Sequence, residues 1–153
     1  SDMLMWSVND TVESVSLQLA SILFSVPQIS VHLDRITEEQ KKALSHYISF
    51  WREHRDILLN GKLYACDPGA VYSKAYSEKD GKAVCVNYED PTVQGEWDSL
   101  VAVNCTGKTY LYLDGFAGKS YKVVNCMGEE IGSGTLAEIS KISVPRGGMI
   151  FVD

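Results

Sequence analysis

The chain has 153 residues, of which 45% are hydrophobic and 22% charged, as in an ordinary soluble globular protein with one core or two small ones. No apolar stretch approaches the roughly 20 residues that a membrane-spanning helix needs, so no membrane partner is expected. The net charge of −6 argues against nucleic acid as a partner, because phosphate binding requires clustered Lys and Arg.

Residues 1–60 are predicted to begin with a strand and a helix. The apolar run 3–6 predicts the end of a buried strand. A capping box at Asp10 and Glu13 then predicts the start of a helix, which Pro27 ends.

A second strand and a second helix follow. Apolar and polar residues alternate over 28–33, which predicts a strand. Thr37 and Gln40 form a second capping box, and Asn60-Gly61 supplies a left-handed cap at the helix end. Two consecutive strand–helix units indicate a parallel sheet or a barrel, with more strands than these two.

The chain changes character after residue 61, where short alternating runs are separated by turns. Asp80-Gly81 is a strong hairpin signal. This spacing predicts an antiparallel sandwich. The candidate strands are 71–77, 82–88, 99–104, 109–113, 121–125 and 142–153, the last interrupted by the turn residues 145–148.

The four cysteines, Cys66, Cys85, Cys105 and Cys126, contain no CxxC pair, so no zinc site is predicted. Buried free thiols and a disulfide both remain open interpretations. No glycine-rich phosphate loop precedes a helix. The sequence therefore predicts neither a metal nor another cofactor.

Three residues are candidates for contact with a sugar. Trp6 and Trp97 offer aromatic rings for stacking, although tryptophan is also common in cores. Asp34 follows a predicted strand and precedes a helix, which places it at an edge where a site can form. A simple loop or capping role for Asp34 is the alternative.

Three stretches resemble a known family. SDMLMW, FSVPQISVHLDRITEEQKKAL and FWREHRDILLNGKL look like the C-terminal portion of bacterial α-galactosidase-like glycoside hydrolases of family 36. The Asp-Met-Leu core also resembles the Asp-Pro-Asp-Met-Leu motif of the related family 27. The resemblance is specific over 1–61 and loose over the rest of the chain.

The resemblance implies a fold and a division into domains. Residues 1–60 would be the C-terminal end of a TIM-barrel catalytic domain, that is, the last two βα units of a (β/α)₈ barrel. Residues 61–153 would be an antiparallel β-sandwich domain.

The resemblance also implies a function: a retaining hydrolase that removes terminal α-linked galactose from oligosaccharides. Both catalytic aspartates of that family would lie upstream of Ser1, so no catalytic residue is expected in this chain, and the chain alone is expected to be inactive. Asp2 matches an aspartate near the sugar-binding end of the barrel and would have a supporting role. Asp34 resembles the aspartate that follows the eighth strand.

A non-catalytic carbohydrate-binding or oligomerisation module is the alternative function. Because Ser1 and Asp2 precede the first methionine, Met3, a fragment of a longer protein is expected. The apolar strands of such a fragment would expose their edges, which predicts a homo-oligomer. The cellular compartment is left open.

Overall fold

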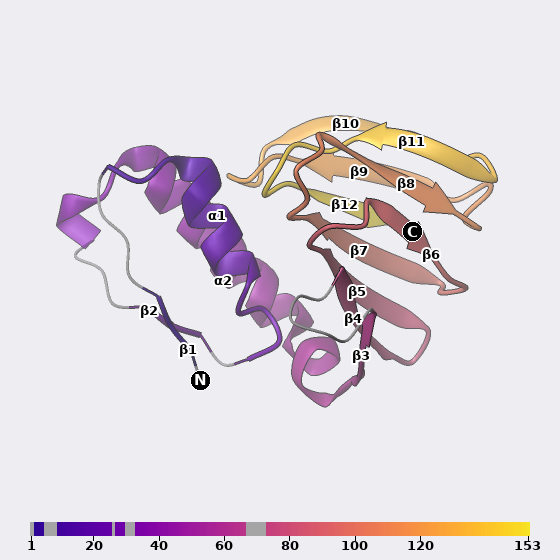
Figure 1. Ribbon diagram of the computed structural model, residues 1–153, viewed down its shortest axis with the longest axis horizontal. Helices are drawn as coiled ribbons and strands as arrows, with labels where there is room; N and C mark the ends of the chain where they lie inside the picture. The colour runs from indigo at the N-terminus through magenta and orange to yellow at the C-terminus, as the bar shows by residue number, and fades with distance from the viewer. Residues whose placement is uncertain (1, 5–8, 26, 30–32, 67–72) are drawn as a thin grey trace.

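Figure 1 shows a computed structural model of the chain, which describes residues 2–4, 9–25, 27–29, 33–66 and 73–153. The helical elements are α1 (Val12–Ala20), the 3₁₀ turn η1 (Leu33–Arg35) and α2 (Glu38–Asn60). The strands are β1 (Asp2–Leu4), β2 (Pro27–Ile29), β3 (Lys62–Cys66), β4 (Lys74–Lys79), β5 (Lys82–Asn87), β6 (Thr92–Gln94), β7 (Ser99–Asn104), β8 (Tyr110–Asp114), β9 (Ser120–Val124), β10 (Glu130–Thr135), β11 (Ile139–Ser143) and β12 (Met149–Val152).

The described strands form three sheets. A seven-stranded sheet has the order β10-β9-β12-β7-β5-β4-β3, a three-stranded sheet has the order β11-β8-β6, and β1 pairs in parallel with β2. The seven-stranded sheet is the middle layer of the molecule. The helices α1 and α2 cover one of its faces, and the three-stranded sheet covers the other (Figure 1).

Strand β5 shows why the middle sheet is covered on both faces. Val84 and Val86 pack among the apolar residues of the helices. Ala83 and Cys85 point the other way and pack against the three-stranded sheet. All four side chains are at most 2% exposed. Side chains alternate along a strand, so an uninterrupted apolar run such as this one is buried on both sides.

The sandwich is not purely antiparallel, contrary to the prediction. The chain leaves the seven-stranded sheet after β5, forms β6 in the three-stranded sheet and returns to form β7 beside β5. The two neighbours therefore run in the same direction, and β5 pairs in parallel with β7. Strands β6 and β8 are parallel for the same reason.

The predicted fold class, two βα units of a (β/α)₈ barrel followed by an antiparallel sandwich, is wrong. The described part of the chain has two α-helices and is mostly β-sheet. Tyr47 and Phe50 of α2 pack on valines of the seven-stranded sheet, so α2 is a cover for that sheet and not part of the outer ring of a barrel. The order of strands and helices alone does not distinguish these two roles.

The capping box of α2 is confirmed, whereas the cap of α1 lies one residue later than predicted. The Gln40 amide nitrogen donates to Thr37 Oγ1 (3.0 Å), and the Thr37 nitrogen donates to Gln40 Oε1 (3.1 Å). Gln40 Nε2 also donates to the Asp10 carbonyl (2.7 Å), which joins the starts of the two helices. The residue that caps α1 is Thr11, whose Oγ1 accepts from the Ser14 nitrogen (3.0 Å).

Gly61 follows α2 without the predicted left-handed backbone. Its φ of −75° and ψ of 169° are extended. A Cβ at this position would lie against Ser77 Oγ and 2.8 Å from the Glu78 carbonyl oxygen. The Ile57 carbonyl oxygen of α2 also lies against this position, so glycine is required here by the close approach of both α2 and β4 and not by the backbone angles.

The turn at 145–148 contacts both helices and joins them to the seven-stranded sheet. Tyr47 is 2% exposed, and its hydroxyl donates to the Gly147 carbonyl (2.7 Å). Gly147 has a φ of +79°, and a Cβ there would collide with Ser16 Oγ of α1 and lie 3.2 Å from Cys126 Cβ. The turn can approach α1 this closely only because residue 147 has no side chain.

Gly147→Ala is expected to lower the free energy of unfolding by about 2–5 kcal/mol, because a positive φ costs about 1–2 kcal/mol and overpacking adds about 1–3 kcal/mol. Gly118→Ala is the matched control: φ is +83°, but its Cβ would meet no described atom within 4 Å, so only the backbone cost of about 1–2 kcal/mol is expected. Urea denaturation measures both losses.

Adding Ser16→Ala to Gly147→Ala removes the oxygen that the new Cβ would strike, and should recover part of the loss. Equal losses for the two glycine variants would show that the turn at 145–148 does not depend on close packing.

Candidate functional site

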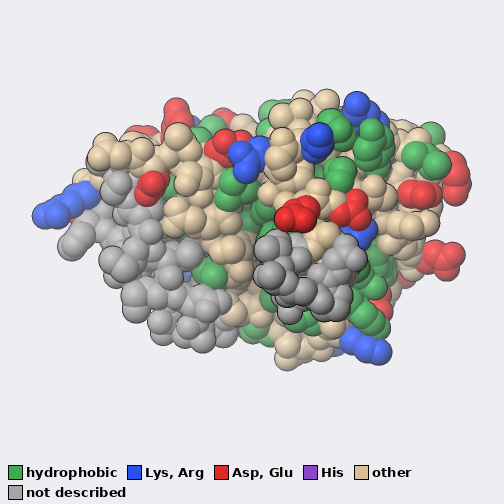
Figure 2. Space-filling view, in the orientation of Figure 1, with side chains coloured by type: hydrophobic (Ala, Val, Ile, Leu, Met, Phe, Trp, Pro, Cys, Tyr) green, Lys and Arg blue, Asp and Glu red, His purple; other side chains and the backbone are tan. Residues whose placement is uncertain are grey.

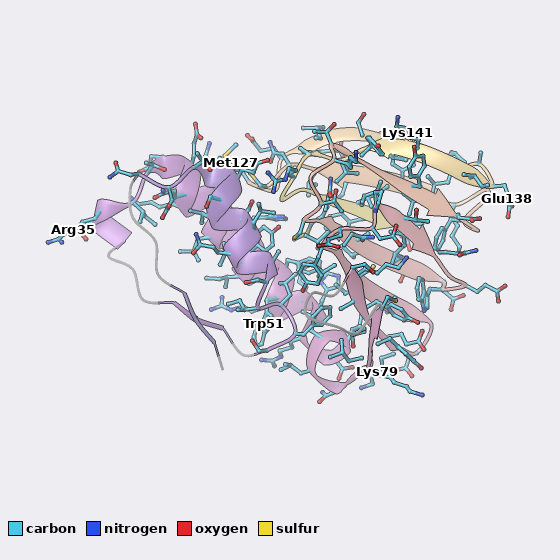
Figure 3. All side chains as sticks on the ribbon, viewed as in Figure 1. Arg35, Trp51, Lys79, Met127, Glu138 and Lys141 are labelled. Carbon is cyan, nitrogen blue, oxygen red and sulfur yellow. The ribbon has the colours of Figure 1, made fainter. Side chains whose placement is uncertain are left out.

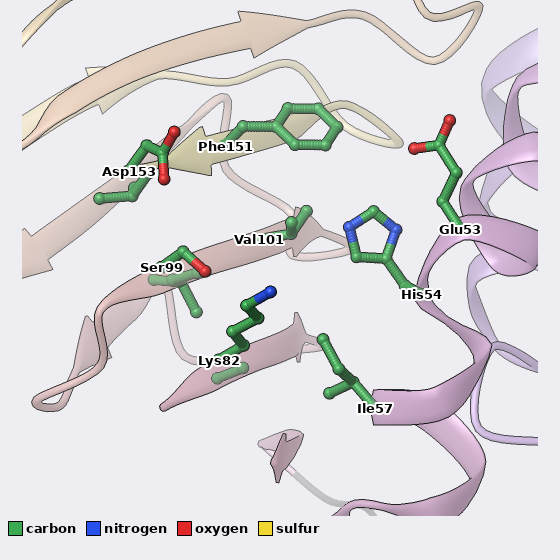
Figure 4. A pocket seen from close by; sticks show the side chains of 11 residues that line it. Glu53, His54, Ile57, Lys82, Ser99, Val101, Phe151 and Asp153 are labelled. Atoms are coloured by element: carbon green, nitrogen blue, oxygen red, sulfur yellow. The ribbon is translucent and has the colours of Figure 1, made fainter. Parts of the chain in front are cut away.

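A pocket of about 300 Å³ lies between the second half of α2 and one end of the seven-stranded sheet (Figure 4). We call it the α2–sheet pocket. Its lining residues are Glu53, His54, Ile57, Lys82, Ala83, Ser99, Leu100, Val101, Phe151, Val152 and Asp153.

The strand register brings three polar side chains to this pocket. Lys82 and Ser99 begin the parallel neighbours β5 and β7 and lie opposite each other. β12 runs antiparallel to β7, so Asp153, just after its last residue, lies at the same end of the sheet. Alternation along each strand then turns Lys82, Ser99 and Asp153 toward the helices, because Ala83, Leu100 and Val152 face the other sheet.

Helix α2 supplies the opposite wall. His54 Nδ1 lies 2.9 Å from the Phe50 carbonyl oxygen. A carbonyl oxygen can only accept, so Nδ1 carries the proton of this hydrogen bond. The His54 ring stacks on Phe50, with 4.2 Å between the ring centres. These two contacts fix the ring with Nε2 pointing toward the strands, as Figure 4 shows, and Glu53 projects beside it.

A second cavity, of about 660 Å³, lies on another face of α2. We call it the outer α2 pocket. Its lining residues are Asp34, Lys41, Leu44, Ser45, Ile48, Ser49 and Arg52. Leu44 is 7% exposed, so the cavity has an apolar floor with charged groups around it.

The sequence candidates do not gather at either pocket as a group. Asp34 is exposed in η1 and borders the outer α2 pocket. Its neighbour Arg35 lies at the end of the molecule farthest from the sheets (Figure 3). Asp2 lies in β1, paired with Pro27, where only the backbone is described, and Trp6 lies outside the described residues.

Trp97 lies on the other side of the seven-stranded sheet, packed against the cluster shared with the three-stranded sheet. Its Nε1 donates to Glu78 Oε2 (2.6 Å). The ring lies edge-on to Tyr76 (5.3 Å between ring centres) and parallel to Phe116 (6.4 Å). The indole is half-buried and held on several sides, which is the environment of a packing residue.

Trp97→Ala is expected to lower the free energy of unfolding by about 2–3 kcal/mol, less than for a fully buried tryptophan. Trp97→Phe keeps an aromatic ring but loses the bond to Glu78, so a smaller loss of about 1 kcal/mol is expected. Urea denaturation measures both. Unchanged stability in Trp97→Ala would mean that the ring is free to stack on a ligand.

Three of the four cysteines, Cys85, Cys105 and Cys126, are poor nucleophiles. All four are free. Burial raises the pKa of the Cys85 and Cys105 thiols to about 12, and it also raises the pKa of Cys126. A thiol must ionise to attack a substrate, so these side chains act as small apolar groups.

His46 is a titratable group in the helix–sheet interface. Its Nε2 is buried and has no hydrogen-bond partner among the described residues. A Cβ at Gly128 would lie 2.7 Å from its Nδ1, so the loop at 127–128 packs directly on the ring. Burial lowers the pKa of His46, and the charge of Glu53 opposes that effect in part.

The free energy of unfolding is therefore expected to fall between about pH 7.5 and pH 5.5. In the unfolded chain His46 takes up a proton near its ordinary pKa of 6.5, whereas in the folded protein it does so only at lower pH. Protonation thus favours unfolding, and His46→Gln should flatten the dependence. Urea denaturation at several pH values is the measurement.

The Asp56 carboxylate does not contribute to this pH dependence, because it titrates at lower pH. Hydrogen bonds from Asn60 and Lys79 lower the pKa of Asp56, so its contribution is present above about pH 4 and is lost only below that value. An unchanged slope in His46→Gln would assign the dependence to other groups.

No protein-family model matches the chain, and no curated protein matches it significantly. None of the described helices is long and apolar enough to cross a membrane. Within the described ranges, no three His, Cys, Asp or Glu side chains come together as metal ligands would. On the face that Figure 2 shows, acidic and basic side chains are interspersed.

The α2–sheet pocket could not be predicted from the sequence. Lys82, Ser99 and Asp153 are far apart in the chain, and each is unremarkable in its own segment. Only the parallel pairing of β5 with β7 brings Lys82 beside Ser99, and the sequence predicted an antiparallel arrangement. His54 falls within the predicted second helix, but nothing in the sequence connects its side of that helix with a site.

Proposed function

We propose that this chain is the non-catalytic C-terminal part of an α-galactosidase-like retaining glycoside hydrolase, which removes terminal α-linked galactose from oligosaccharides. In such an enzyme a nucleophile and a general acid must both be present and positioned, and the resemblance assigns both to residues outside this chain. The chain would then pack against the catalytic part.

The outer α2 pocket is the observation that carries this proposal. One side of α2 is fully used by the seven-stranded sheet, through Tyr47 and Phe50. A different side of the helix borders a cavity, with Leu44 and Ile48 between Lys41 and Arg52. Leu44 and Ile48 also pack in the helix–sheet cluster, so the cavity presents a small apolar floor, with charged and hydroxyl groups around it, on which another part of a protein could pack. The stretches that carry the resemblance include Lys41, Leu44 and Arg52, whereas Ile48 lies between them.

The decisive assay is release of nitrophenol from an aryl α-galactoside. The 153-residue chain is expected to release none above the blank, because it lacks both catalytic groups, whereas the product of the whole gene is expected to be active. Activity of the 153-residue chain, or an inactive whole-gene product, would contradict the proposal.

Variants of the whole-gene product test the role of the outer α2 pocket. Ser45 and Ser49 are exposed and border the cavity, so Ser45→Arg with Ser49→Arg should fill it and lower activity at least about tenfold. Ser133→Arg, at an exposed position on β10, is the matched control and should leave activity unchanged.

A non-catalytic carbohydrate-binding or oligomerisation module is the second candidate. The mixture of carboxylate, ammonium and hydroxyl groups at the α2–sheet pocket favours sugar binding. Among the described residues, the most exposed large apolar side chains are Leu59, Leu63, Ile131 and Ile139, at 41–66% exposure. Leu63 and Ile131 belong to the two edge strands of the seven-stranded sheet. These edges are where a homo-oligomer would form.

A further inference from the structure

We propose that the α2–sheet pocket is a binding site for one neutral sugar unit. The choice of a sugar as ligand agrees with the function proposed above, but the site requires no catalytic activity and would serve a binding module equally well.

The charged side chains that line the pocket favour an uncharged ligand with several hydroxyl groups. Glu53 and Asp153 can only accept hydrogen bonds when ionised, and Lys82 can only donate. Among the described residues, none of these three charged groups has an ion-pair partner. An anion would meet the two carboxylates, and a cation would meet the ammonium group. A sugar hydroxyl both donates and accepts, so one molecule can satisfy all three.

Two further groups adapt to either role. The Ser99 hydroxyl donates and accepts. His54 has its Nδ1 proton committed to the Phe50 carbonyl, so its Nε2 is an acceptor in the neutral ring and a donor in the charged one. The pocket thus surrounds its volume with donors and acceptors from α2, β5, β7 and the end of β12.

The pocket also has apolar surface that fits the C–H faces of a sugar ring. Phe151, Ile57 and Val101 line the pocket between the polar groups (Figure 4). The C–H faces of a sugar ring can pack on such surface while its hydroxyls reach the rim. Phe151 is held in place by Phe50, with 6.2 Å between ring centres, and by Lys122 Nζ, 5.2 Å from the ring centre.

The polar groups stand on rigid supports. The strand positions of Lys82 and Ser99 are fixed by the β5–β7 ladder, and the Asp98 nitrogen donates to the Gly81 carbonyl (2.7 Å) just before Ser99. The Asp153 nitrogen donates to the Ser120 carbonyl (2.9 Å). The backbone positions are therefore fixed before a ligand binds, whereas the exposed Lys82 and Asp153 side chains still lose rotamer freedom, which limits the affinity.

The volume sets the size of the ligand and its affinity. At about 300 Å³ the pocket lies at the small end of the range for ligand sites, so it fits one sugar unit and not a long oligosaccharide. For a ligand of about a dozen non-hydrogen atoms, a Kd on the order of millimolar is expected.

The test is an NMR titration of the ¹⁵N-labelled chain with D-galactose, D-glucose and inorganic phosphate, each to about 100 mM, well above the expected Kd. Saturable shifts are expected with a sugar, at the amides of 53–57, 99–101 and 151–153. Lys82→Gln and Asp153→Asn should each weaken binding about tenfold. Both side chains are exposed, so the variants should fold. Lys108→Gln, at an exposed lysine outside the pocket lining, is the control and should leave the Kd unchanged.

The inference is overturned if neither sugar shifts these amides, or if phosphate binds more tightly than both sugars. It is also overturned if Lys82→Gln and Asp153→Asn bind sugar with the same Kd as the unmodified chain. These failures are distinct from failure of the proposed enzyme function, because the galactoside assay on the whole-gene product does not depend on this pocket. Tighter binding of glucose than of galactose would support the site and count against a galactosidase.

Discussion

The need to bury both faces of the seven-stranded sheet governs this structure. Strands β5 and β7 carry apolar side chains in both directions, and neither face can be left to water. At about 25 cal/mol per Å² of apolar surface, each uncovered valine would cost on the order of 2 kcal/mol. The helices α1 and α2 therefore serve as one cover and the three-stranded sheet as the other. The hydrogen bond from Tyr47 to Gly147, in the turn at 145–148, fixes the position of α2 on the sheet.

The local elements could be predicted from the sequence because their signals are local. The Thr37–Gln40 capping box and the Asp80-Gly81 hairpin are confirmed, with positive φ values of +53° and +77° at the hairpin. Strands β5 and β7 lie where the apolar runs placed them. The strand β10 was missed because its sequence, EIGSGT, is rich in glycine and exposed, so it carries no burial pattern.

The arrangement of these elements could not be predicted in the same way. A strand–helix–strand–helix order is compatible with a barrel and with a helical cover on a separate sheet, and the choice depends on what the apolar stripe of α2 contacts. The α2–sheet pocket depends on a parallel register between strands separated by a crossover. Such pairings are nonlocal, so no short segment encodes them. Trp97 was chosen for its ring, but its bond to Glu78 depends on a residue 19 positions away.

The passage of the chain between the two sheets has a consequence for how the protein assembles. Four successive strands, β5 to β8, alternate between the seven-stranded and the three-stranded sheet. Neither sheet can be completed before the other has begun, so the two layers form one cooperative unit and not two subdomains. Pairings of this kind close long loops before they gain contacts, which slows folding relative to a chain of simple hairpins. For the same reason, a proteolytic cut between β6 and β8 would separate strands of both layers at once, so neither fragment would keep a complete sheet.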